Sequence, residues 1–127
     1  MPFVCPECMT ARSLKITHRI ELPSDSRSDE IAVQIVRCSR CRFRGAAVYE
    51  ESRRGALDSE SVDHRGYKVK KADLKSLVDK IEACPDPKNA RCQCPSHRSL
   101  GQKDSGGRWR GLDDIEYEDT FPMDLVL

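Results

Sequence analysis

Two short cysteine pairs constrain the fold of this chain more than any other feature. Each pair has two residues between its cysteines: Cys5-Pro-Glu-Cys8 and Cys38-Ser-Arg-Cys41. Two intervening residues let the backbone turn tightly enough for both thiolates to reach one ion. Two such pairs on either side of a hairpin are typical of a tetrahedral zinc site. Cys5, Cys8, Cys38 and Cys41 are therefore predicted to hold one Zn²⁺.

The other three of the seven cysteines lie together in the second half of the chain. Cys84 is followed by Cys92 and Cys94, and His97 comes three residues later. A Cys-x-Cys segment places two sulfurs on the same side of an extended chain, and three cysteines with one histidine form an accepted structural zinc set. We therefore expect Cys84, Cys92, Cys94 and His97 to hold a second Zn²⁺, which gives two zinc ions per chain.

Other interpretations of the cysteines stay open. Reduced cysteines also pack as small apolar side chains, and a pair at this spacing is also found in redox sites. Spacing does not separate zinc from iron in a four-thiolate site, and the second group is also compatible with an iron–sulfur cluster. In a further alternative, Cys84 is the buried end of a helix and His97 an ordinary loop residue, with His18 and His64 as reserve ligands.

The composition favours a fold that is stabilised by metal. Of the 127 residues, 38% are apolar, 34% are charged and 6% are aromatic. Such a chain has difficulty offsetting its conformational entropy by burial alone, and structural metals are a usual remedy in small domains. No apolar run approaches the roughly 18–20 residues of a membrane span, and the N-terminus lacks a basic-then-apolar signal segment. We expect a cytoplasmic protein, or a nuclear one in a eukaryote, with reduced cysteines.

Hydrophobic alternation predicts the structure of the first fifty residues. Apolar and polar residues alternate from Leu14 to Leu22, as in a half-buried strand, and the polar segment 23–30 follows as a hairpin loop. A returning strand over 31–35 runs into the second cysteine pair, and 42–50 supplies a third strand. Residues 1–50 are therefore predicted to be a zinc ribbon with a three-stranded antiparallel sheet.

The rest of the chain is predicted to contain one helix. Leu74, Leu77, Val78 and Ile81 recur at i, i+3, i+4 and i+7, which indicates a helix over roughly 70–83. The fold class is thus a small metal-stapled α+β protein, a ribbon followed by one helix and a Cys3His zinc loop. The predicted units are a zinc ribbon at 1–50, a connection at 51–66, the helix and second zinc site at 67–100, and a flexible linker with an acidic and apolar tail at 101–127.

The block over residues 5–49 resembles the zinc-ribbon superfamily found in many transcription proteins. Its two cysteine pairs are similar to those of the small zinc-ribbon elongation factors. Arg27-Ser28-Asp29-Glu30 also resembles the acidic loop of transcript-cleavage factors, in which an Asp–Glu pair at the loop tip enters RNA polymerase and helps hold a catalytic Mg²⁺. That resemblance implies a polymerase accessory role for Asp29 and Glu30, and the alternative is a solvated turn. Residues 50–127 match neither group.

Charge is distributed unevenly, and this bears on the partner. Residues 112–127 hold six of the 21 acidic residues and no base, which leaves 15 acids against 22 bases, or +7, in residues 1–111. We predict that the basic part binds nucleic acid or a nucleic-acid-bound protein complex through phosphate or carboxylate contacts. The side chains predicted to make these contacts surround the second cysteine pair: Arg37, Arg40, Arg42 and Arg44.

The acidic tail offers a second route to a partner. Tyr117, Phe121, Met123 and Leu125 lie among the acids and are predicted, in this alternative, to dock as a short motif in a partner's groove. The tail would otherwise fold back over the basic surface. We expect no enzymatic activity, no small-molecule substrate and no membrane partner, because saturated metals, the missing nucleophile–base motif and the missing phosphate-cradling loop all argue against catalysis.

Overall fold

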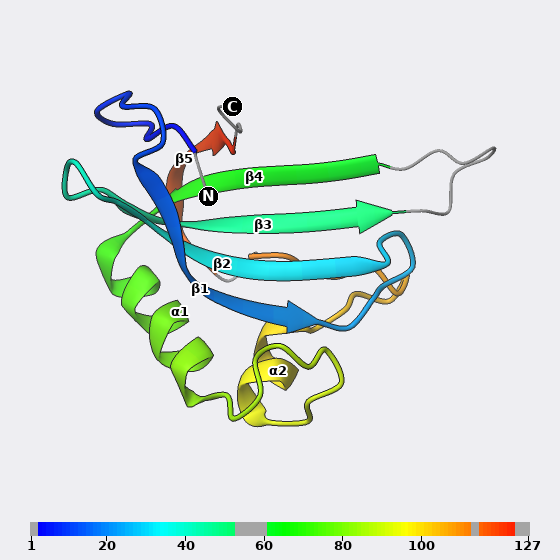
Figure 1. Cartoon of the computed structure of the whole chain (residues 1–127). Coiled ribbons are helices and arrows are strands. Elements are labelled where there is room, and N and C mark those ends of the chain that lie inside the picture. The colour runs from blue at the N-terminus through cyan, green and yellow to red at the C-terminus, as the bar shows by residue number, and fades with distance from the viewer. Residues whose placement is uncertain (1–2, 53–60, 113–114, 124–127) are drawn as a thin grey trace.

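The computed structural model describes residues 3–52, 61–112 and 115–123. This part of the chain forms a five-stranded antiparallel sheet whose strand order follows the sequence, with helices against one face (Figure 1). No described helix is long and apolar enough to cross a membrane. The elements are β1 (Leu14–Leu22), β2 (Glu30–Cys38), β3 (Arg44–Ser52), β4 (Ser61–Val69), α1 (Lys71–Ala83), α2 (Pro95–Leu100) and β5 (Tyr117–Pro122).

The three strands predicted for the first fifty residues are present, but a three-stranded ribbon with one helix is not confirmed. β4 pairs with β3, β5 pairs with β4, and a second short helix follows the first. Residues 51–66 were predicted to be a connection, yet β4 begins within them, while 53–60 lie outside the described residues. β4 has few apolar side chains, and its pairing on both edges supplies backbone hydrogen bonds that hydrophobic alternation does not reveal.

A bulge in β1 divides its apolar residues between the two faces of the sheet. The register shifts between Ile16, which pairs with Val36, and His18, which pairs with Ile35. Because the side-chain period of a strand is two, one extra residue moves everything beyond it to the other face. Residues 14 and 16 therefore pack in one hydrophobic cluster, and 20 and 22 in another. The sequence pattern predicted a single face for all of them.

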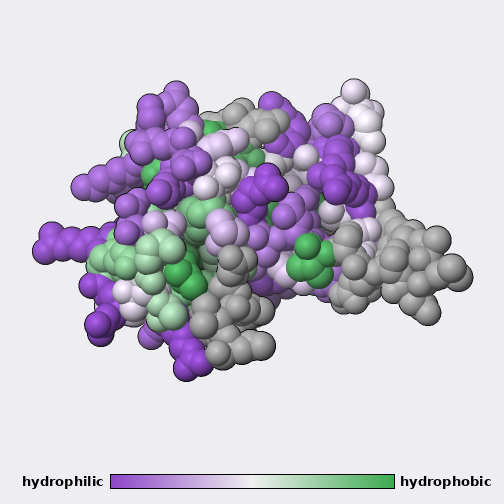
Figure 2. Space-filling model, turned by 90° about the horizontal axis from the view of Figure 1, so that it is seen from above, coloured by the Kyte–Doolittle hydropathy of each residue, from purple (hydrophilic) through white to green (hydrophobic). Residues whose placement is uncertain are grey.

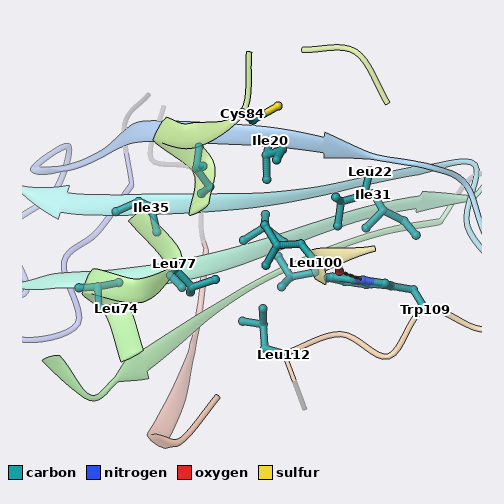
Figure 3. Packing of buried hydrophobic residues seen from close by; sticks show 14 residues of the cluster. Ile20, Leu22, Ile31, Ile35, Leu74, Leu77, Cys84, Leu100, Trp109 and Leu112 are labelled. Atoms are coloured by element: carbon teal, nitrogen blue, oxygen red, sulfur yellow. Dashed lines mark hydrogen bonds between the residues drawn. The ribbon is translucent and has the colours of Figure 1, made fainter. Parts of the chain in front are cut away.

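The larger cluster lies between the sheet and the helices. Apolar residues of β1, β2 and β3 meet Leu74, Leu77 and Ile81 of α1, which are spaced as predicted for one helical face. Leu100 and Trp109 close the other end of this layer, and the Trp109 indole N–H donates to the Leu100 carbonyl at 2.7 Å (Figure 3). The fold thus gains a core although its overall apolar content is low.

The segment predicted to be a flexible linker and tail belongs to the fold instead. Trp109 is 7% exposed, and the backbone around it forms a bridge with Lys103. Phe121 and Met123 are buried in the smaller cluster on the other face, beside the N-terminal residues. Gly66 of β4 makes room for the Phe121 ring, because a Cβ there would lie 2.1 Å from a ring carbon.

A buried carboxylate fastens the β1–β2 loop to the Trp109 segment. Asp25 accepts hydrogen bonds from the backbone N–H groups of Arg27, Ser28 and Trp109, and it pairs with the Arg108 guanidinium at 2.5 Å. Its side chain has no exposed surface. Burial alone would raise the pKa of Asp25, but these four donors outweigh it and lower that pKa to about 2. Asp25 was not singled out from the sequence, since its partners are distant in the chain.

Candidate metal centres

The two cysteine pairs at the N-terminal end come together at one end of the sheet. The first pair lies in the turn before β1, and the second lies in the turn between β2 and β3. The Sγ atoms of Cys5 and Cys41 are 3.7 Å apart, as are those of Cys8 and Cys38. Bonds of about 2.3 Å at tetrahedral angles to one ion would separate two sulfurs by about 3.8 Å. The arrangement therefore fits four-thiolate coordination of one ion.

Hydrogen bonds to the sulfurs favour the thiolate forms that a metal requires. The Arg40 and Cys41 amides both donate to Cys38 Sγ at 3.3 Å, and the Phe43 amide donates to Cys41 Sγ at 3.4 Å. Burial would raise the pKa of Cys38, but a hydrogen bond with Ser13 and the amides of Cys41 and Arg40 lower it to about 6. Burial raises the pKa of Cys5, so a cation is needed to make all four thiolates stable together.

The second predicted group also converges. Cys84 is the C-cap of α1, Cys94 is the N-cap of α2 and His97 lies in α2, so two helix ends position most of the ligands. The four ligand atoms lie within 4.8 Å of one another. Cys84 Sγ is 3.9 Å from Cys92 Sγ, and His97 Nδ1 is 3.2 and 3.3 Å from the sulfurs of Cys84 and Cys94. Tetrahedral coordination would give about 3.8 Å between sulfurs and about 3.5 Å between sulfur and nitrogen, so the group is slightly contracted on the histidine side.

The His97 ring is oriented by the sheet. Its Nε2 lies 2.9 Å from the carbonyl oxygen of Glu21, so Nε2 carries the proton and donates to that oxygen. Nδ1 is then the lone-pair nitrogen that faces the three sulfurs. A second hydrogen bond to a backbone carbonyl is the usual way to fix the tautomer of a metal-binding histidine. The His97 side chain is buried, as expected of a ligand rather than a loop histidine.

This group also protects an edge of the sheet. β1 is an edge strand, and its Glu21 N–H donates to the Pro87 carbonyl of the cysteine loop at 2.7 Å. The Glu21 carbonyl accepts the hydrogen bond from His97 Nε2, so the N–H and the C=O of Glu21, which both point away from β2, are both paired. An open strand edge invites association with other chains, and covering it with a loop is a common remedy. The second cluster therefore connects α1, α2 and β1.

Both clusters are compatible with structural metal ions and leave no ligand position open. Four protein ligands complete a tetrahedral ion, whereas catalytic zinc sites usually keep one position for water or substrate. Hydrogen bonds also support the second cluster, because the Asp86 amide donates to Cys84 Sγ and the His97 amide donates to Cys94 Sγ, each at 3.4 Å. Burial would raise the pKa of Cys94, but the hydrogen bond from the His97 amide and the contacts with the His97 ring and the other two sulfurs lower it to about 6.

The two reserve histidines lie outside both clusters. His18 pairs with Glu82 of α1 at 3.0 Å, and His64 packs edge-on against Phe3 and Tyr49 while its Nε2 contacts Gln34 Oε1 at 2.7 Å. Burial and the nearby Arg19 lower the pKa of His64. Neither histidine belongs to a described group of ligands that could hold a metal.

The four predicted arginines gather at one end of the sheet. Arg37 is the last residue but one of β2, Arg40 and Arg42 lie in the following turn, and Arg44 begins β3. All four side chains are exposed. The register brings a lysine beside them, because Lys15 of β1 lies directly opposite Arg37, and Arg37 lies directly opposite Arg44. Strand pairing is needed to find this alignment.

Asp29, Glu30 and two of the predicted tail residues do not lie where their predicted roles would require. The turn of the β1–β2 loop is built around Asp25, and Asp29 and Glu30 lie at its base, where the Asp29 amide donates to Glu51 and Glu30 begins β2. Among the predicted tail residues, Tyr117 is 48% exposed, Phe121 and Met123 are buried, and Leu125 lies outside the described residues. Phe121 and Met123 thus pack in the core and are not presented for docking.

Comparisons with known protein families, with curated proteins and with solved structures give no match.

Proposed function

We propose that this protein is a non-catalytic binding module, held together by two structural zinc ions, that grips an anionic macromolecule at the basic end of its sheet. The chemistry of the donor sets supports zinc, because four thiolates or three thiolates and an imidazole in tetrahedral arrangement suit that ion. Complete coordination supports a structural role. The transcription-type ribbon resemblance of residues 5–49 supports a partner in a nucleic-acid-associated complex.

The observation that carries the binding proposal is a row of like charges across three strands. Lys15, Arg37 and Arg44 occupy directly opposite positions on β1, β2 and β3, with neighbouring strands about 4.8 Å apart. Like charges directly opposite on a sheet are destabilising. None of the three forms an ion pair with a carboxylate among the described residues, and a bound anion would relieve their repulsion.

The carboxylates that form ion pairs lie mostly in other parts of the described structure. Most described ion pairs lie on α1, at β5 or in the Asp25 clamp, away from this row. Seen from above, the described surface is mainly hydrophilic, and hydrophobic residues gather toward the end that carries both cysteine pairs (Figure 2). Multiple exposed cations give salt-dependent affinity for a polyanion, with little discrimination between sequences.

The test is binding to two labelled polyanions, polyglutamate and an RNA oligonucleotide, over a range of salt concentrations. The zinc-loaded full chain should bind at least one of them, with affinity that falls steeply as salt rises. Replacing Lys15, Arg37 and Arg44 by Gln should weaken binding at least tenfold. A control with the same charge change places Gln at exposed Lys88, Arg98 and Lys103, and it should bind like the wild type.

The proposal is wrong if neither polyanion binds at low salt. It is also wrong if the two triple variants lose affinity equally, because general charge and not the row would then account for binding. Both variants change only exposed positions, so their zinc content should match the wild type and their thermal stability should be no lower, which would confirm that the fold is intact.

A further inference from the structure

A groove with an apolar floor and a basic rim runs beside the cation row. The groove has a volume of about 870 Å³ and lies between the second cysteine turn and α1. Arg42 and Arg44 border it on the turn side, and Lys71 and Lys75 border it on the helix side. Figure 1 shows α1 beginning beneath the turn between β2 and β3.

The floor of this groove is apolar. Ala72, Val69 and Val78 form an apolar floor, and no acidic residue lines it. Val69 and Val78 are half-buried and pack against the main core, so an apolar side chain placed in the groove would extend that core.

The charges on the rim are only partly neutralised by the protein itself. Lys75 pairs with Asp79 on the same helix at 3.1 Å, in an exposed pair that contributes little. Asp73 turns toward the Glu116 amide, to which its carboxylate binds at 3.0 Å. Arg42, Arg44 and Lys71 form no ion pair with a carboxylate among the described residues. The rim therefore attracts negative charge.

We infer that the groove binds an acidic amphipathic segment of a partner protein, with its apolar side chains on the floor and its carboxylates against the rim. This inference rests on the proposed function and names the class of its polyanionic partner. Charge complementarity accounts for the rim, and burial of apolar side chains accounts for the floor. Lys71, Lys75 and Val78 are spaced i, i+4 and i+7 on α1, so rim and floor follow one helical face along the groove.

A nucleic acid fits the same groove less well. Phosphates placed over Val69, Ala72 and Val78 would lose water without gaining partners from the floor. No aromatic side chain lines the groove, so bases would find no stacking surface there. An acidic peptide with an apolar face satisfies both parts of the surface.

The experiment measures the binding of three labelled probes to the zinc-loaded full chain. The first is a helical peptide of about 16 residues with leucine at every third or fourth position and glutamate on the other face. The second has the same composition in scrambled order, so that it keeps the charge and loses the apolar face. The third is an RNA oligonucleotide. We expect the amphipathic peptide to bind at least tenfold more tightly than the scrambled one.

Substitutions at Ala72 separate the floor from the rim. Ala72 is exposed on α1, and Ala72→Gln covers the floor with a polar amide without changing charge or the helical preference appreciably. This variant should lose about tenfold in affinity for the amphipathic peptide and keep its affinity for the other probes. Ala72→Leu is the matched control of similar size, and it should retain peptide binding because the floor remains apolar.

The outcomes distinguish this inference from the proposed function. Equal binding of both peptides, or no effect of Ala72→Gln, overturns the groove while leaving the basic row as the polyanion site. Binding of the RNA alone overturns the acidic-peptide inference in favour of nucleic acid. If none of the three probes binds, the proposed function fails together with the inference. If peptide binding survives only in wild type and Ala72→Leu, the groove is established as the docking site.

Discussion

Replacing Asp25 by Asn tests whether the β1–β2 loop is fastened by a buried carboxylate. Asp25→Asn keeps the size of the side chain and removes its charge, so the donors from Arg27, Ser28, Trp109 and Arg108 face a weaker acceptor. Arg108 retains Glu50 at 3.3 Å, so the substitution does not leave an unpaired guanidinium. The effect measured is therefore the preference of the folded site for an ionised acid.

The size of that effect follows from the pKa. The pKa of Asp25 falls from an ordinary 3.8 to about 2 in the folded protein. At about 1.4 kcal/mol for each tenfold change in proton affinity, the ionised carboxylate stabilises the fold by about 2.5 kcal/mol relative to the neutral acid. Asp25→Asn should lower the free energy of unfolding by about this amount near pH 7, and the melting temperature by about 10 °C.

The assay is denaturant unfolding of the zinc-loaded protein, followed by tryptophan fluorescence from Trp109. Asp104→Asn is the matched control, because Asp104 accepts backbone hydrogen bonds from Gly106 and Arg108 in the same segment but is exposed. It should cost about 1 kcal/mol or less. A loss below about 0.5 kcal/mol for Asp25→Asn, or equal losses for both variants, would refute the clamp.

The pH dependence has a defined direction. Because the folded-state pKa of Asp25 lies below its ordinary value, its stabilising contribution is complete above about pH 4 and is lost as the pH falls toward 2. Acid also protonates the cysteine ligands, so the quantity to follow is the difference in stability between wild type and Asp25→Asn, which share those ligands. That difference should shrink only below pH 4. A difference that already disappears at pH 6 would contradict the assignment.

A pair of substitutions and a truncation test the packing of β5. Gly66→Ala should destabilise the protein by about 2 kcal/mol, because its methyl group would overlap the Phe121 ring. In a double-mutant cycle measured by thermal unfolding, Gly66→Ala combined with Phe121→Ala should lower the free energy of unfolding by less than the sum of the two single changes. Truncation after Glu116 should lower the free energy of unfolding by about 3 kcal/mol or more, because it removes Phe121 and Met123 from the smaller core. An unchanged melting temperature after that truncation would contradict this packing and support the prediction of a tail that is independent of the fold.

The sequence alone predicted the features that depend on local spacing. The cysteine pairs, the helix face of Leu74, Leu77 and Ile81, and the first hairpin all repeat over a few residues, and the structure contains each of them. Cysteine and histidine at 84–97 converge as expected because helix ends bring short segments together.

The features that were missed depend on pairing between distant residues. β4 and β5 carry mixed polar and apolar side chains, and their place in the sheet follows from partners up to dozens of residues away. The bulge after Ile16 preserves the alternating pattern in sequence while it reverses the faces in space. The charges of residues 112–127 mask the apolar character of Phe121 in the sequence, and only the strand register reveals its place opposite Gly66.

The metal content of the purified protein tests the central claim of two structural zinc ions most directly. Elemental analysis of the wild type should give two zinc ions per chain, and Cys8→Ser and Cys94→Ser should each retain about one, since each removes a ligand from a different cluster. One zinc in the wild type, or two in Cys94→Ser, would contradict the second centre. Iron in place of zinc would contradict the structural role and point to redox chemistry.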